Sequence, residues 1–202
     1  IDVMGTDLTV VNAARVSFGK KKEKFEKGDE KLIKYLAKHN HWSPFGHCML
    51  QFHIKAPVFV ARQLVKHQIG LVWNEISRRY VDTEPEFYEV DKWRGKPIDK
   101  KQGSDGEVEK QGSCYHSKQM VENNARIAYN SLLDAGVAPE QARMILPQSM
   151  MTEWYWSGTL YAFARVCNLR CKPDAQLESR EVCDMIDKQV EELTYHYHHD
   201  ED

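Results

Sequence analysis

Long apolar runs are missing from the sequence, and their absence excludes one class of protein at once. No stretch approaches the roughly 20 consecutive apolar residues that a membrane-spanning helix needs. The first segment, IDVMGTDLTVVNAARVSF, also lacks the basic start and apolar centre of a signal peptide. We therefore expect a cytoplasmic protein with no membrane partner.

A large excess of either charge is also lacking. The sequence carries 28 basic and 30 acidic residues, which gives a formal net charge of -2. So small an imbalance creates no general field that would attract nucleic acid. We expect no nucleic-acid partner, and any anion site must be built locally from a few side chains.

Cysteines are few, odd in number and scattered. The five lie at Cys48, Cys114, Cys167, Cys171 and Cys183, a spacing that is not typical of a disulfide framework, so reduced thiols are expected. Cys167 and Cys171 are four residues apart on an expected helix, but no second Cys/His pair at zinc-finger spacing accompanies them. The sequence therefore predicts no metal site.

Two families of local motif are absent. Neither a P-loop nor a dinucleotide-binding glycine pattern occurs, so a P-loop kinase or a Rossmann oxidoreductase has no support. No local pattern indicates a Ser-His-Asp or Cys-His nucleophile, and His47 beside Cys48 is interpreted as core packing at the start of a strand. Chemistry that depends on these motifs is not predicted.

The patterns that are present predict an α+β fold, with a small antiparallel sheet flanked by helices, in a single domain over residues 1–202. The segment at about 91–113 is rich in Gly, Lys and acids, and is interpreted as a surface excursion of that domain. The alternation in CMLQFHIKA predicts a strand, and Pro57 ends it and opens a helix, PVFVARQLVKHQ. Further helices are expected in a segment that ends near Asn40 and at about 116–135, 139–146, 151–169 and 174–193.

Several arginines could serve a local anion site. In VWNEISRRY, Ser77, Arg78 and Arg79 together supply a hydroxyl and two guanidinium groups, which match a phosphate or a carboxylate. A solvated turn explains the same residues. Arg143 on an apolar helix could equally snorkel to the surface, and Arg170 at a helix end is favoured there by the macrodipole. The residues alone leave both interpretations open.

Six ordered segments resemble the flavin-dependent thymidylate synthases, the ThyX family. They are DVMGTDLTVVNAARVSF, HWSPFGH, FHIKAPVFVARQLVKHQIG, NEISRRY, ARMILP and NLR, and the resemblance runs from residue 2 to about residue 190. It implies an enzyme that converts dUMP to dTMP with a methylene group from 5,10-methylenetetrahydrofolate. Reducing equivalents would come from NADPH through bound FAD. The resemblance also implies a homotetramer whose active sites are shared between subunits.

The resemblance assigns residues to the two ligands by position. The dUMP positions are Gln63, Glu75, Ser77, Arg78, Arg79, Arg143 and Arg170, and the resemblance implies that Arg143 reaches dUMP from a neighbouring subunit. The FAD positions are Ser17, His41, Ser43, Lys66, His67, Gln68, Glu75, Thr159, Tyr161 and Arg165, the last three reaching FAD from a neighbouring subunit. Arg170 is the implied catalytic residue, because a fixed cation would stabilise negative charge on the pyrimidine as its N3 ionises. No cysteine or serine nucleophile is implied.

The sequence departs from the family signature at the flavin positions. The signature is Arg-His-Arg, seven residues and Ser, whereas this chain has Lys66-His67-Gln68 and eight residues before Ser77. Lysine loses the planar guanidinium fork and glutamine loses the charge, so weaker or reoriented FAD binding is expected. These changes indicate a divergent member of the family. If it is viral, it would act in the host cytoplasm.

Two alternatives keep the same fold. The first is a dUMP hydroxymethylase, in which water traps the transferred methylene group and gives 5-hydroxymethyl-dUMP. The second is a non-catalytic relative that binds nucleotide or RNA. Product analysis separates the first from a thymidylate synthase, and failure to bind and reduce FAD would favour the second.

Overall fold

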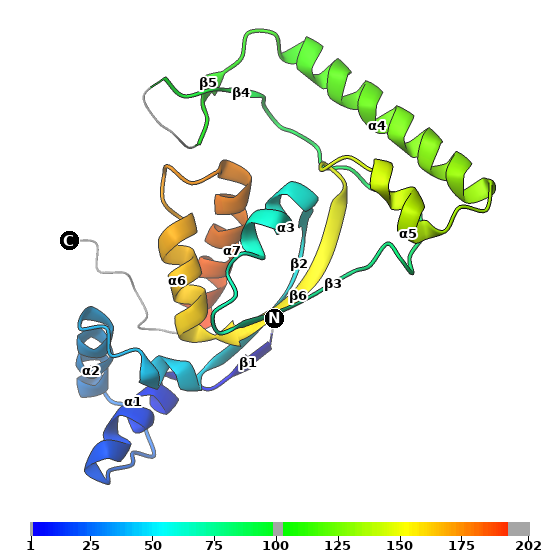
Figure 1. Cartoon of the computed structure of the whole chain (residues 1–202). Coiled ribbons are helices and arrows are strands. Elements are labelled where there is room, and N and C mark those ends of the chain that lie inside the picture. The colour runs from blue at the N-terminus through cyan, green and yellow to red at the C-terminus, as the bar shows by residue number, and fades with distance from the viewer. Residues whose placement is uncertain (1, 99–102, 194–202) are drawn as a thin grey trace.

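A four-stranded antiparallel sheet lies at the centre of the computed structural model, which describes residues 2–98 and 103–193 (Figure 1). Its strands follow the order β1-β2-β6-β3. They comprise β1 (Asp2–Met4), β2 (Met49–Pro57), β6 (Met151–Thr159) and β3 (Leu71–Glu75). The predicted α+β class with a small antiparallel sheet is confirmed. β1 and β3 add two short strands that the sequence patterns do not predict.

The helix predicted over 151–169 is wrong in its first half. Residues Met151–Thr159 form β6, which pairs with β2 over nine residues from Met49↔Thr159 to Pro57↔Met151. Helix α6 begins only at Leu160 and ends at Arg170. The cause is a period of two in the aromatic segment, because Trp154 and Trp156 are buried whereas Tyr155 between them is 51% exposed. Aromatic side chains of this kind favour a pleated, half-buried strand.

Helices α3 (Val58–Leu64), α6 and α7 (Leu177–Leu193) pack against the sheet and enclose the main core. Figure 1 shows α6 and α7 side by side next to β2 and β6. Phe163 of α6 makes edge-on contacts with Phe52 of β2 and Trp156 of β6, at ring-centroid distances of 4.9 and 5.3 Å. Burial of these large rings stabilises the attachment of α6 to the sheet.

The predicted helix PVFVARQLVKHQ ends earlier than expected, at Leu64. Lys66 and His67 therefore lie in the turn that leads to β3. Gly70 adopts φ +74° in this turn, and its carbonyl accepts a hydrogen bond from the Thr159 backbone at 3.3 Å. A Cβ atom on Gly158 would lie 2.3 Å from the same carbonyl oxygen, so this close approach requires glycine. The turn is thus held tightly against β6.

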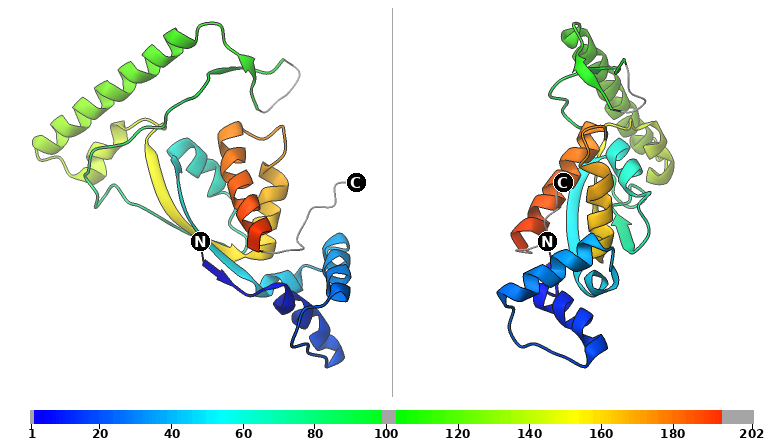
Figure 2. Two further views of the ribbon diagram at one scale, coloured as in Figure 1. Left: turned by 180° about the vertical axis from the view of Figure 1, so that it is seen from behind. Right: turned by 90° about the vertical axis from the view of Figure 1, so that its left-hand side faces the viewer.

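The N-terminal unit consists of α1 (Asp7–Arg15), the 3-10 turn η1 (Val16–Phe18), α2 (Lys27–Lys38) and the 3-10 turn η2 (Ser43–His47). The helix predicted to end near Asn40 is α2. The long helix α4 (Gln111–Asp134) lies at the other end of the sheet from this unit (Figures 1 and 2). Short segments α5 (Pro139–Ala142) and η3 (Arg143–Ile145) follow α4.

The excursion predicted over about 91–113 contains a small two-stranded sheet, β4 (Arg94–Gly95) with β5 (Asp105–Glu107). Its last three residues, 111–113, are helical because α4 begins at Gln111. The Gln111 side chain accepts a hydrogen bond from the Trp93 backbone at 2.9 Å and donates one to the Trp93 carbonyl at 2.7 Å. These two bonds fasten the excursion to the start of α4. Within residues 2–98 and 103–193, no helix has the length and apolar character to cross a membrane.

Asp29 ties the N-terminal helices together. Its side chain is fully buried, and its carboxylate accepts hydrogen bonds from Arg15 Nη2 at 2.8 Å and Lys22 Nζ at 2.7 Å. Burial by itself would raise the pKa of Asp29. The hydrogen bonds from Lys22, the Glu26 backbone and Arg15 outweigh that effect and leave the pKa below its ordinary value.

We predict that Asp29→Asn lowers the free energy of unfolding by about 2 kcal/mol at neutral pH, because charge-assisted hydrogen bonds to a buried carboxylate are lost. A depressed folded pKa contributes stability above the unfolded value of about 3.8, and this stability is lost as the pH falls through the folded pKa. The difference between variant and wild type should therefore shrink below about pH 4. Urea unfolding at neutral and acid pH measures it, with the exposed Asp134→Asn as control. An undiminished difference at acid pH would contradict the argument.

Candidate active site

A cavity of about 540 Å³ lies between the ends of β3 and β6 and the α5–η3 segment. We call it the arginine cavity, because Arg62, Arg78 and Arg143 line it together with Glu75. The Glu75 carboxylate is oriented from two sides. It accepts a hydrogen bond from Thr152 Oγ1 at 2.7 Å and another from its neighbour on β3, the Trp73 indole, at 3.2 Å. Lys55, Glu84, Glu86 and Glu153 also line the cavity, and Lys55 pairs with Glu86 at 2.6 Å. The three guanidinium groups and the oriented Glu75 carboxylate suit a ligand that carries both an anion and hydrogen-bond donors.

The Ser77–Arg79 segment follows β3, and Arg78 of this segment lines the cavity. Ser77 Oγ accepts hydrogen bonds from Arg79 Nε at 3.2 Å and from the Arg79 backbone at 3.3 Å. Arg78 donates to the Thr83 carbonyl and lies 5.9 Å from the ring centroid of buried Tyr129. Cation–π contact and the carbonyl hold the guanidinium in place. Arg78 therefore anchors the segment to α4, a connection that its sequence position does not indicate.

A second, smaller cavity of about 120 Å³ holds the predicted flavin positions of the altered signature. We call it the signature cavity, since Lys66, His67, Gln68 and Arg165 line it. Arg170 Nε donates a hydrogen bond to His67 Nε2 at 2.9 Å. Burial lowers the pKa of His67, and the nearby Arg170 and Arg165 lower it further. The predicted catalytic arginine is thus in direct contact with the middle residue of the signature.

The remaining predicted flavin positions lie around a third cavity and at the start of α6. Ser17, His41 and Ser43 line a cavity of about 690 Å³ in the N-terminal unit, with Trp42 beside them. The Trp42 ring lies 5.6 Å from the ring of Tyr161, which connects this unit to α6. Thr159 caps α6, because its Oγ1 accepts a hydrogen bond from the Ala162 backbone at 3.1 Å.

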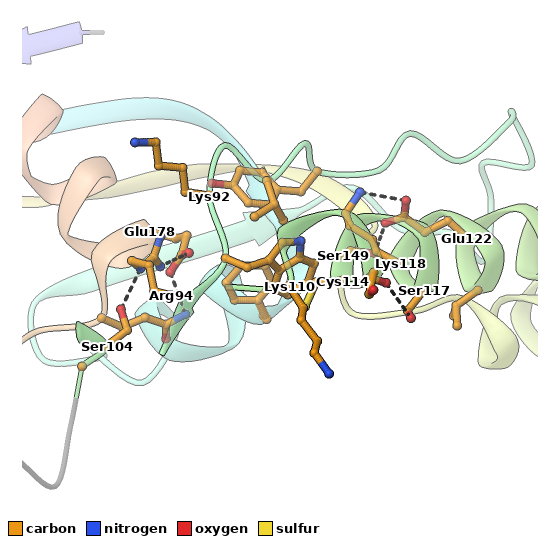
Figure 3. Close-up of a pocket in the computed structure, with 18 of the residues that line it drawn as sticks. Lys92, Arg94, Ser104, Lys110, Cys114, Ser117, Lys118, Glu122, Ser149 and Glu178 are labelled. Carbon is orange, nitrogen blue, oxygen red and sulfur yellow. Dashed lines mark hydrogen bonds and ion pairs between the residues drawn. The ribbon is translucent and has the colours of Figure 1, made fainter. Parts of the chain in front are cut away.

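A cavity of about 1080 Å³, which we call the excursion cavity, separates the excursion and α4 from the core (Figure 3). It contains one predicted site residue, Gln63, whose Oε1 accepts a hydrogen bond from Ser179 Oγ. The cations on its walls are largely paired within the chain. These pairs are Arg94 with Glu178, Lys92 with Glu107 at 2.7 Å, and Lys118 with Glu122 at 2.8 Å.

Two of these pairs, Arg94 with Glu178 and Lys118 with Glu122, are shielded from solvent, whereas Lys92 and Glu107 are exposed. The Glu122 carboxylate also accepts a hydrogen bond from Ser149 at 2.6 Å, and Figure 3 shows both contacts on one wall. Burial would raise the pKa of Glu178, but the hydrogen bonds from Arg94, the Glu178 backbone and Gln176, together with the charge of Arg94, outweigh this and the pKa is lowered. Sequence reasoning missed these residues, because Arg94 and Glu178 are 84 positions apart and carry no motif. Because most cations on the walls of this cavity are paired with carboxylates, the cavity does not resemble an anion site.

Comparison with known proteins identifies the family to which the chain belongs. The model of the family described as "Thymidylate synthase complementing protein" (Thy1) matches residues 1–194. The chain is also 42% identical over 192 residues to a flavin-dependent thymidylate synthase of Thermus thermophilus, covering 95% of this chain and 70% of that protein. The chain belongs to the flavin-dependent thymidylate synthase family.

Other members and solved structures agree. The flavin-dependent thymidylate synthase of Thermosipho africanus is 42% identical over 181 residues, which cover 88% of this chain and 78% of that one. A crystal structure of the UMP/dUMP methylase PolB from Streptomyces cacaoi, bound with 5-Br dUMP, superposes with a TM-score of 0.85 at 30% identity. That superposition covers 96% of this chain and 89% of PolB. The resemblance stated from the sequence motifs is confirmed.

Within one chain, the residues predicted to bind the same ligand do not lie together. Of the dUMP positions, Glu75, Arg78 and Arg143 line the arginine cavity, whereas Gln63 lines the excursion cavity and Arg170 contacts His67. The FAD positions are divided between the signature cavity, the N-terminal unit and the start of α6, and Glu75 lines the arginine cavity. Among the described residues, no cluster of three or more His, Cys, Asp or Glu could hold a metal ion.

Proposed function

We propose that the chain catalyses the reductive methylation of dUMP to dTMP. 5,10-Methylenetetrahydrofolate supplies the carbon, NADPH the reducing equivalents, and FAD is the bound cofactor. The observation that carries this proposal is the family match over residues 1–194. We place the reaction in the cytoplasm, where reducing conditions suit five cysteines that are all free.

The separation of the cavities supports a shared active site. Arg143 and Arg170 both belong to the proposed dUMP site, yet they line or adjoin different cavities of one chain. A homotetramer in which one subunit supplies the arginine cavity and another supplies Arg170 would bring them to one nucleotide. In that arrangement the arginine cavity, with Ser77 and Arg79 on either side of its lining residue Arg78 in the sequence, binds the phosphate, since guanidinium groups match phosphate oxygens in pairs.

Arg170 acts on the other end of the nucleotide. A fixed guanidinium beside the pyrimidine stabilises negative charge as N3 ionises, which makes C5 more nucleophilic. No thiol of the chain is then needed to attack the ring. Burial raises the pKa of Cys48 to about 11 and that of Cys183 to about 12, so neither supplies a thiolate at neutral pH. These values fit a reaction without a cysteine nucleophile.

The residues present fit FAD. A dinucleotide needs cations for its diphosphate and flat surfaces for its rings. Lys66 and Arg165 supply exposed cations at the signature cavity, Ser17 and Ser43 supply hydroxyls, and Trp42 offers an exposed ring. When bound, FAD carries the electrons from NADPH to the transferred carbon, while the role of these side chains is to hold and orient it.

The altered signature gives a prediction about FAD affinity. The double variant Lys66→Arg with Gln68→Arg should bind FAD about tenfold more tightly, because two planar forks replace a point charge and a neutral amide. Titration followed by flavin fluorescence measures the change. Lys38→Arg, on the exposed end of α2, is the matched control. Unchanged affinity of the double variant would show that the extra residue before Ser77 has redirected the signature away from FAD.

Product analysis tests the proposed reaction. Purified protein is incubated with dUMP, 5,10-methylenetetrahydrofolate, NADPH and FAD, and the nucleotide is identified by mass spectrometry. We expect dTMP. A 5-hydroxymethyl product would overturn the proposal in favour of a hydroxymethylase, and colourless protein that does not oxidise NADPH would favour a non-catalytic relative. A parallel incubation with UMP is included because PolB is a UMP/dUMP methylase.

A further inference from the structure

The contact between His67 and Arg170 fixes the protonation of the imidazole. Arg170 is the last residue of α6, and His67 lies 103 positions earlier in the turn before β3. An arginine Nε–H donates and never accepts. His67 Nε2, 2.9 Å away, must therefore present its lone pair. The ring is neutral, with its proton on Nδ1.

We propose that His67 is the positioning residue for Arg170: it accepts the Nε hydrogen bond and so aims the terminal nitrogens of the guanidinium at the pyrimidine. This inference rests on the proposed function and gives His67 a role beyond the flavin contact expected from the signature. A guanidinium held only by its flexible stem would sample many rotamers. When Arg170 Nε is hydrogen-bonded to His67, the plane of the guanidinium group is fixed before the substrate binds.

The turn that carries His67 is rigid enough to position another side chain. The Thr159 backbone donates a hydrogen bond to the Gly70 carbonyl at 3.3 Å, three residues after His67. Gly158 leaves no space for a side chain beneath that carbonyl. The His67 backbone itself donates to the Leu64 carbonyl at 3.0 Å, at the end of α3. Positioning residues are effective when their own backbone is fixed in this way.

Charges around His67 keep it in the accepting form. Arg170 and Arg165 face it from α6, Lys66 precedes it in the turn, and the described residues that line the signature cavity include no acid. Burial and the two arginines lower the pKa of His67 from 6.5. Below this lowered pKa the ring gains a proton, loses its lone pair at Nε2 and repels Arg170. Orientation of Arg170 is therefore lost on the acid side.

Two substitutions separate positioning from flavin contact. His67→Gln keeps an acceptor oxygen but does not titrate, and His67→Ala removes the acceptor. We expect His67→Ala to lower kcat on the order of 10²-fold at saturating FAD and dUMP, because misplacement of a catalytic group by about 1 Å costs that much. His67→Gln should keep kcat within about tenfold of wild type. Its pH profile of kcat should lack the part of the fall below about pH 6.5 that protonation of His67 causes in the wild type.

The control and a second readout make the test independent of turnover. His116→Gln, an exposed histidine on α4, should leave the pH profile of kcat unchanged. Ionisation of bound 5-fluoro-dUMP, followed by ultraviolet difference absorbance, reports directly on Arg170. The wild type and His67→Gln should bind the N3 anion, whereas His67→Ala should bind the neutral ring. Thermal melting checks that each variant is folded.

The outcomes are distinct. Equal loss of FAD and of activity in His67→Ala and His67→Gln would overturn the proposal and leave His67 as a flavin ligand only. An unchanged acid limb in His67→Gln, or anionic 5-fluoro-dUMP on folded His67→Ala, would also overturn it. If the wild type makes no dTMP, the proposed function fails. The positioning role still stands in that case when 5-fluoro-dUMP ionises on the wild type and on His67→Gln but not on His67→Ala.

Discussion

Arg170→Ala is expected to reduce the kcat for dTMP formation by on the order of 10²- to 10³-fold while FAD stays bound. Removal of a preorganised group that stabilises developing charge has an effect of this size. Arg170 does not line the signature cavity itself and contacts it through His67, so its loss leaves Lys66 and Arg165 in place for the cofactor. Steady-state kinetics with a parallel measurement of bound flavin absorbance separates the two effects.

Two further variants make this result specific. Arg180→Ala removes an exposed arginine contact on the neighbouring helix α7, where the guanidinium donates to the Pro173 carbonyl at 3.1 Å, and should leave kcat unchanged. Arg170→Lys keeps a charge but has no Nε–H for His67, so it should recover only a minor part of the activity. Flavin lost together with activity in Arg170→Ala would show that Arg170 has a structural or cofactor role instead.

The sequence predicts the elements whose periodicity is clear and fails where a segment satisfies two patterns. Alternation in CMLQFHIKA predicts β2, and the apolar spacing before Asn40 predicts α2. The aromatic segment TEWYWSGTLYAFA is compatible with a helical stripe, and only its pairing with β2 over nine residues shows that Met151–Thr159 is a strand. Strand pairing joins residues far apart in the chain, which local patterns do not report.

In the candidate site, too, the sequence predicts local groupings of residues but not contacts between distant segments. Motifs place Lys66, His67 and Gln68 together, because they are adjacent in the sequence, and the structure keeps the three around one cavity. The bond from Arg170 to His67 spans 103 positions and follows from the packing of α6 on the sheet, so no local spacing indicates it. Arg78 is a comparable case. The sequence shows it only as one of two adjacent arginines, and its contact with Tyr129 requires α4 to be in place.

Arg143→Ala is expected to raise the KM for dUMP by about 10- to 100-fold with a much smaller change in kcat. A hydrogen bond to a charged group contributes about 1.5–3 kcal/mol, and each 1.4 kcal/mol is tenfold in affinity. Arg143 is exposed, and its Nε donates a long hydrogen bond of 3.3 Å to the Glu140 carbonyl, so the fold should tolerate its loss. Initial rates over a range of dUMP concentrations measure the effect, with the exposed Lys188→Ala on α7 as control.

Mixed tetramers then decide whether Arg143 and Arg170 reach one nucleotide from different subunits. If the site is shared, co-expression of an Arg143→Ala chain with an Arg170→Ala chain creates some sites that carry both substitutions and others that carry neither. The mixture then regains activity at low dUMP that neither variant has by itself. If one chain supplies both arginines, every site carries one substitution and the mixture gives only the average of its parents. Because the two arginines belong to different cavities of one chain, we expect the recovery.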